Sequence, residues 1–107
     1  MNRTTTFANR AHLSAGYAMG EKALAEMKEN LKAVQQTEPG KLSIAQLAKY
    51  ESGFAATIAH VEEVQARVKR MIEAKTEEEF EVVIHEMAAL AHQNPRPTYE
   101  AYIGELK

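Results

Sequence analysis

The chain has 107 residues, of which 45% are hydrophobic and 26% charged, and its formal net charge is −2. These values are typical of one folded domain with a single core, and they exclude a disordered or membrane-embedded protein. The chain contains no cysteine, which excludes disulfides and thiolate catalysis. Because no apolar run is long enough to cross a bilayer and the N-terminus lacks the apolar core of a secretory signal, we expect a cytoplasmic protein without membrane contact.

Apolar residues that recur at alternating spacings of three and four predict a first helix over residues 7–36. Threonines at positions 4 to 6 can cap its start, and Pro39-Gly40 can end it. Its apolar stripe comprises Leu13, Tyr17, Gly20, Leu24, Met27, Leu31 and Val34. Alanines on the opposite side of this helix would let another helix approach, and a Gly16-x-x-x-Gly20 pair adds to that tendency. Alanine is also the best helix former on an exposed face, and that explanation is preferred.

The second helix is predicted over residues 44–75, and its start is the clearest local signal in the chain. Ser43 and Gln46 have the spacing of a capping box, in which each side chain satisfies the other residue's backbone N–H. The apolar stripe that follows comprises Leu47, Tyr50, Phe54, Thr57, Val61, Val64, Val68 and Met71, widened by Ile44, Ile58 and Ile72. This pattern indicates a helix that faces the core along its whole length.

A second capping box, from Thr76 to Glu79, predicts a third helix over residues 77–93. The apolar stripe shifts register at this point, so a tight turn is favoured over one continuous bent helix, which remains the alternative. Asn94-Pro95-Arg96-Pro97 ends the third helix, and Thr98 can cap a short final helix over residues 99–106.

The predicted fold is all-α: one domain over residues 1–107, built as an elongated antiparallel hairpin with a shorter third helix and a short C-terminal helix. The first two helices are about 45 Å long and the third about 25 Å, at 1.5 Å per residue. The third helix should therefore cover only the start of the first helix and the end of the second. The other half of the hairpin, next to the loop that joins its two helices, is left uncovered. We expect a second copy of the chain to cover it in a homodimer, and the C-terminal segment is the alternative.

No catalytic or cofactor motif is recognisable, so an enzyme is not expected. None of the four histidines has the spacing of a metal site: His85-Glu86 begins an H-E-x-x-H pattern, but position 89 is alanine. Residues 16–22 superficially resemble a phosphate-binding loop, with the wrong spacing and inside a helix. Neither a metal nor a cofactor is predicted, although a site formed between chains stays open.

The sequence therefore predicts a non-enzymatic, self-associating helical protein that binds another macromolecule as regulator, adaptor or inhibitor. Phage- and plasmid-encoded accessory proteins often share its size, acidic balance and lack of cysteine. The predicted partner-binding residues are Leu24, Met27, Leu31, Phe54, Tyr99 and Tyr102. One alternative is a nucleic-acid-binding protein that uses Arg67, Lys69 and Arg70. Another is a small-ligand binder with a pocket between subunits. Residues 76–107 carry seven Glu and only two Lys or Arg, which favours charge pairing within or between chains over a nucleic-acid face.

Overall fold

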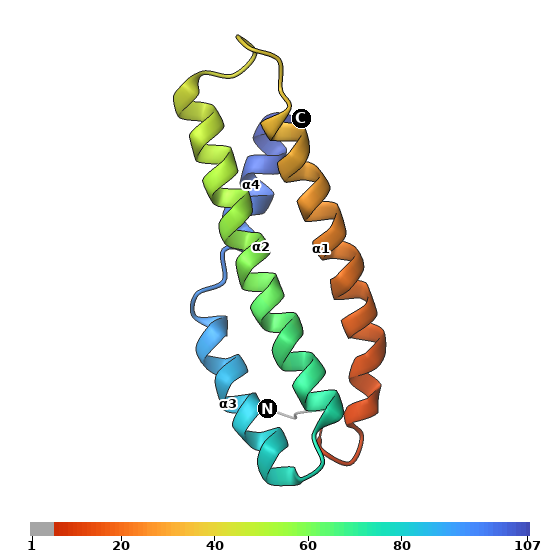
Figure 1. Cartoon of the computed structure of the whole chain (residues 1–107). Coiled ribbons are helices and arrows are strands. Elements are labelled where there is room, and N and C mark those ends of the chain that lie inside the picture. Colours follow the sequence, from red (N-terminus) through yellow and green to blue (C-terminus); the bar gives the residue numbers. More distant parts are fainter. Residues whose placement is uncertain (1–5) are drawn as a thin grey trace.

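The computed structural model describes residues 6–107, and every element in that part of the chain is helical, as predicted (Figure 1). The elements are a 3-10 helix at Arg10–His12, followed by α1 (Leu13–Gln35), α2 (Ile44–Glu73), α3 (Glu77–Ala91) and α4 (Arg96–Leu106). The molecule measures 54 × 23 × 20 Å, and its radius of gyration of 16.8 Å exceeds the ~13 Å of a compact domain of this length. The chain is therefore an elongated bundle of helices.

The start of α2 forms as predicted. The Ser43 side chain accepts a hydrogen bond from Gln46 N at 3.1 Å, and Gln46 Oε1 accepts one from Ser43 N at 2.9 Å. Ile44, however, is 90% exposed and does not widen the apolar stripe, whereas Leu42 and Leu47 on either side of it pack against the core. From this cap α2 runs the length of the molecule, with α1 packed beside it in the opposite direction (Figure 1).

A tight turn separates α2 from α3, as the register shift indicates. The Thr76 hydroxyl accepts a hydrogen bond from Glu79 N at 3.1 Å, which caps α3. The predicted reciprocal bond is wrong by one residue: the Glu79 carboxylate accepts from Lys75 N at 3.0 Å and not from Thr76 N. The Glu79 carboxylate therefore connects the loop between α2 and α3 to the start of α3.

The start of α1 differs from the prediction. Thr4 and Thr5 lie outside the described residues, and the Thr6 hydroxyl donates to Asn9 Oδ1 instead of capping a helix. The α-helix begins only at Leu13. The physical reason is the ring of Phe7, which packs edge-on against Phe80 of α3 with the ring centroids 6.2 Å apart. This contact turns the segment away from the axis of α1.

The C-terminal helix also begins early, at Arg96 rather than residue 99. Proline lacks the backbone N–H, which the first turn of a helix does not need, so Pro97 is accommodated inside α4. Thr98 is consequently not the cap, and Asn94 Oδ1 instead accepts from Arg96 N at 3.1 Å.

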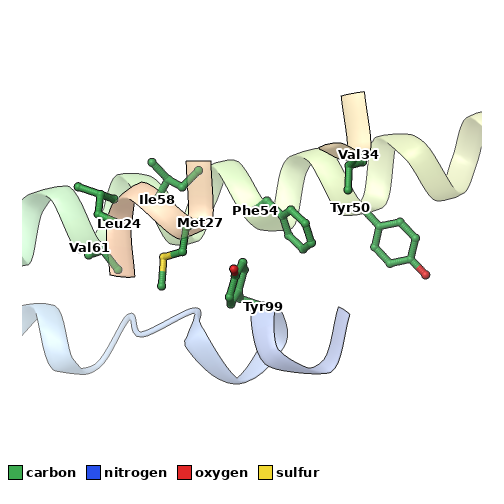
Figure 2. Packing of buried hydrophobic residues seen from close by; sticks show 8 residues of the cluster. All are labelled: Leu24, Met27, Val34, Tyr50, Phe54, Ile58, Val61 and Tyr99. Atoms are coloured by element: carbon green, nitrogen blue, oxygen red, sulfur yellow. The ribbon is translucent and has the colours of Figure 1, made fainter. Parts of the chain in front are cut away.

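Helix α4 folds back over the half of the hairpin that was expected to be open (Figures 1 and 2). The Tyr99 ring inserts between α1 and α2, with its centroid 5.0 Å from that of Phe54. The expectation of an exposed far half was therefore wrong. Of the two occupants considered, the C-terminal segment covers this half, because its Tyr99, Tyr102 and Ile103 form an apolar face.

Candidate functional site

The six residues predicted to bind a partner lie together, but inside the molecule. Four of them are at most 9% exposed, and the other two are half-buried against the same cluster. The buried ones are Leu24, Met27, Phe54 and Tyr99, and the half-buried ones are Leu31 and Tyr102. Figure 2 shows Tyr99 of α4 directed at Met27 and Phe54. These residues form the core between α1, α2 and α4, and a partner can reach the buried ones only if α4 leaves.

Polar contacts fix α4 in this position. Asn30 Nδ2 donates to the Tyr99 hydroxyl at 2.8 Å. The Glu105 carboxylate accepts from Lys49 Nζ and from the Tyr50 hydroxyl, each at 2.9 Å. The hydrogen bond from Lys49 lowers the pKa of Glu105, and the bond to Glu105 raises the pKa of Tyr50. The acidic C-terminal helix is thus paired with a lysine of α2 within the same chain.

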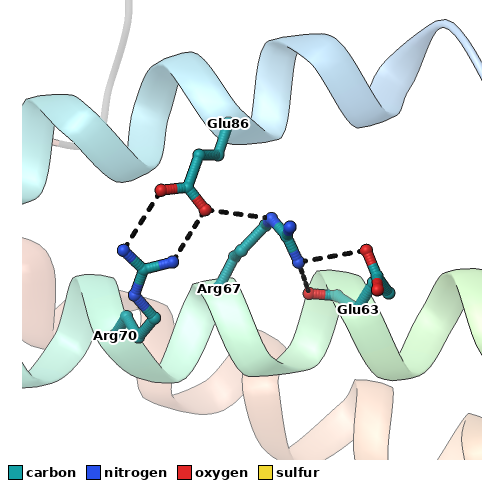
Figure 3. A network of polar contacts seen from close by, with 4 residues as sticks. All are labelled: Glu63, Arg67, Arg70 and Glu86. Atoms are coloured by element: carbon teal, nitrogen blue, oxygen red, sulfur yellow. Dashed lines mark hydrogen bonds and ion pairs between the residues drawn. The ribbon is translucent and has the colours of Figure 1, made fainter.

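The three residues proposed for nucleic-acid contact are mostly engaged within the chain (Figure 3). Arg70 binds both oxygens of Glu86, at 2.7 and 3.1 Å, and this bond lowers the pKa of Glu86. Arg67 Nε lies 3.3 Å from Glu86 Oε1, at ion-pair distance but without hydrogen-bond alignment, and Arg67 Nη1 lies 3.3 Å from Glu63 Oε2. Lys69 is exposed. Two of the three cations therefore join α2 to acidic side chains and do not form a free basic face.

The histidines are not assembled into a site. His12, His85 and His92 are exposed, and His60 is half-buried. Within residues 6–107, no three His, Asp or Glu side chains gather as a metal ion would require.

An apolar groove remains where α3 was expected to cover the start of the first helix. The expectation holds for the end of the second helix, against which α3 packs, but only in part for the first, because the backbone of α3 stays away from α1 (Figure 1). The N-terminal part of the chain meets the cluster around Phe80 through Phe7 and Leu13. The result is a groove of about 490 Å³ between the first half of α1 and the second half of α2.

The lining of this groove is mostly apolar, and its α1 side includes three small residues. Its α1 wall is formed by Leu13, Gly16, Tyr17, Gly20 and Ala23, its α2 floor by Val64, Gln65 and Val68, and Arg96 stands at one end. Met19 projects from the rim and is 73% exposed. Most of these lining residues are apolar, which suits the binding of apolar side chains.

The one buried polar side chain in the groove is satisfied. Gln65 is 7% exposed, and its Nε2 donates to the backbone oxygen of Tyr17 at 2.8 Å and to Glu21 Oε1 at 3.2 Å. Its amide lies so close to Gly20 that a Cβ at that position would overlap it. Gln65 therefore ties α2 to α1 beneath the groove, and Gly20 is required for that contact.

The same flank of α1 stays uncovered towards its C-terminal end. A second pocket, of about 370 Å³, lies between α1 and α4 and is lined by Glu26, Asn30, Ala33, Val34, Thr37, Phe54, Ile103, Leu106 and Lys107. Of the α1 residues that line these two pockets, we call six that lie outside its apolar stripe the open flank: Gly16, Met19, Ala23, Glu26, Asn30 and Ala33. None of them is among the residues predicted to bind a partner. The sequence feature that could have pointed to the open flank is Met19, a large apolar residue that lies outside the apolar stripe and within the Gly16-x-x-x-Gly20 segment.

Comparison with known proteins gives no guide to this surface: no family model matches the chain, and neither a curated protein nor a solved structure shows significant similarity to it. Among the described residues, no helix is both long enough and apolar enough to pass through a membrane.

Proposed function

We propose that this protein is a non-enzymatic interaction module that binds a helix of a protein partner along the open flank of α1, as regulator, adaptor or inhibitor. The observation that carries the proposal is the uncovered groove of about 490 Å³ with the 73% exposed side chain of Met19 on its rim. An apolar patch that the fold leaves unprotected is more often an interaction surface than an accident.

A helix is the partner structure that this surface fits best. The groove runs beside α1, and its α1 wall contains Gly16, Gly20 and Ala23, whose small side chains permit close approach of a second helix axis. Helices bind in such grooves through apolar side chains at spacings of three, four and seven residues. Charged residues on the exposed side of α1, such as Lys22 and Glu26, would form the polar rim.

The alternatives have weaker support. Nucleic-acid binding through α2 is disfavoured because Arg67 and Arg70 are paired with Glu63 and Glu86. Small-ligand binding is supported by the 370 Å³ pocket between α1 and α4, which lies within one chain and has Phe54 among its lining residues. Native mass spectrometry of the purified protein tests that alternative, since a retained ligand would appear as a defined mass increment.

Site-specific photocrosslinking tests the proposal even though the partner is unidentified. A benzophenone amino acid in place of Met19 is compared with the same probe in place of Ile44, which is 90% exposed but lies far from the groove. In the native host, we expect the probe at Met19 to capture a discrete protein, identified by mass spectrometry, and the probe at Ile44 not to capture it. Equal yields from both positions would count against a binding site on the open flank.

A further inference from the structure

We infer that the helix bound by the open flank is α1 of a second copy of this chain, antiparallel to the first and related to it by a two-fold axis at Met19. This inference rests on the proposed function and names its partner. In a two-fold dimer the same patch on each chain contacts itself, so the patch has to be self-complementary.

The residue spacing on this side of α1 is nearly symmetric about Met19. Glu26 lies seven residues after it, and His12, in the 3-10 helix that directly precedes α1, lies seven residues before it; Gly16 lies three residues before it and Ala23 four residues after it. Reversing the chain direction therefore places Gly16 of one copy within one residue of the position opposite Ala23 of the other. His12 of one copy then faces Glu26 of the other, at both ends of the contact.

The shape of the surface also favours this pairing. At the centre, Met19 projects beside a hollow lined by Gly16, Gly20 and Ala23. A Cβ built at Gly16 has no neighbour within 4 Å, so space beside it is unoccupied in one chain. Each chain thus offers both a projection and a recess, and methionine adapts its unbranched side chain readily to such a recess.

Charge distinguishes the antiparallel from the parallel arrangement. A parallel pair of α1 helices would place Glu26 against Glu26, and like charges across an interface are unfavourable. The antiparallel pair instead places Glu26 beside His12, a hydrogen-bond donor or a cation. Both residues are exposed, and within the described residues neither takes part in a salt bridge.

The accessible area of the chain is sufficient for such an interface. A folded monomer of 11.9 kDa is expected to expose about 6,000 Å², whereas this chain exposes 7334 Å², an excess of roughly 1,300 Å². A standard protein–protein interface removes about 800 Å² from each partner. The elongated chain therefore exposes more surface than a compact monomer of its mass, by more than a standard interface removes from one partner.

The absence of cysteine from the chain allows a direct test by disulfide trapping. In Met19→Cys, the two thiols meet at the proposed axis, and copper–phenanthroline should oxidise them to an intermolecular disulfide. In Ala33→Cys, on the same flank, the two thiols would be about 42 Å apart in the antiparallel pair, at 1.5 Å per residue, but would meet in a parallel pair. Ile44→Cys measures collisional crosslinking at a fully accessible position.

We expect Met19→Cys to crosslink on the order of tenfold faster than Ala33→Cys or Ile44→Cys, because association raises the local thiol concentration. Light scattering after size exclusion should give a dimer mass for the native chain at tens of micromolar and a monomer mass for Met19→Glu, with unchanged helicity by circular dichroism.

Two results would overturn the inference: a monomeric native chain at this concentration with equal crosslinking rates for all three variants, or crosslinking of Ala33→Cys at the rate of Met19→Cys. If the isolated chain is monomeric while the photoprobe at Met19 captures a different protein, the inference fails and the proposed function stands. If that probe also captures nothing, both fail.

Discussion

The ring of Tyr102 in α4 lies directly against the backbone of Gly53 in α2, where an added Cβ would be 2.5 Å from Tyr102 Cε2. Glycine inside a helix costs about 1 kcal/mol relative to alanine, so its presence in the middle of α2 needs a compensating gain. The close approach of Tyr102 supplies that gain. The contact between Tyr102 and Gly53 therefore fixes which turn of α2 the helix α4 packs against.

Gly53→Ala is accordingly expected to destabilise the protein. Forcing an added methyl group into a packed contact costs about 1–3 kcal/mol, partly offset by a gain of about 1 kcal/mol in helix propensity. Urea unfolding followed by circular dichroism measures the net loss. The matched control is Gly104→Ala in α4, where an added Cβ has no neighbour within 4 Å and should stabilise the helix. Equal effects of the two variants would show that Tyr102 does not constrain Gly53.

Tyr99 combines a buried ring with a hydrogen bond from Asn30, and two variants separate these contributions. Tyr99→Phe removes only the hydroxyl and should cost about 0.5–1.5 kcal/mol, the usual net value of one hydrogen bond. Tyr99→Ala leaves a cavity beside Phe54 and should cost about 3–5 kcal/mol, the range for a large aromatic residue in a core. Chemical denaturation gives both values, and a near-neutral Tyr99→Ala would contradict the packing of α4 seen here.

The pH dependence of stability should be governed by Glu86 and Glu105. Hydrogen bonds from Arg70 and Lys49, respectively, lower the pKa of these carboxyls from the ordinary value of 4.5. A carboxyl whose pKa is lowered by folding stabilises the native state above its unfolded pKa, and this contribution is lost as the pH falls through its folded pKa. We therefore expect the midpoint of thermal unfolding to drop as the pH falls below 4.5.

The double variant Glu86→Gln, Glu105→Gln should be less stable at neutral pH and should show a flatter profile below pH 4.5. Replacement of the exposed Glu29 by glutamine removes one carboxylate elsewhere and serves as the control. A double variant with the profile of the native protein would show that these two ion pairs do not contribute to stability.

Nucleic-acid binding through α2 is expected to be absent even at low salt, since Glu63 and Glu86 neutralise Arg67 and Arg70. Fluorescence anisotropy with labelled DNA and RNA, titrated at about 50 mM salt and again at about 200 mM, is the appropriate measurement, because phosphate contacts weaken steeply with salt. Salt-sensitive binding that Lys69→Glu abolishes would restore the nucleic-acid alternative.

The helical content and most of the helix boundaries follow from short-range features of the amino-acid sequence. The cap between Ser43 and Gln46, the cap at Thr76 and the break at residues 74–76 all depend on groups within four residues of one another. Local hydrogen bonding and steric preferences govern such features, so they can be predicted before the fold is seen. The uneven distribution of charge along the chain likewise predicted pairing of the acidic C-terminal region with cations, within or between chains, and the structure shows pairs within the chain.

Which apolar surface is buried and which is left exposed depends on contacts between distant segments. Tyr99 and Phe54 are 45 residues apart, and the sequence offered both the C-terminal segment and a second chain as cover for the same stripe. The separation of α3 from α1 follows from the contacts of α3 with α2 and Phe7, and it places the uncovered surface on the flank beside Met19 instead of the far half. A periodic stripe shows that a helix has an apolar face, but only the positions of all the helices show what covers it.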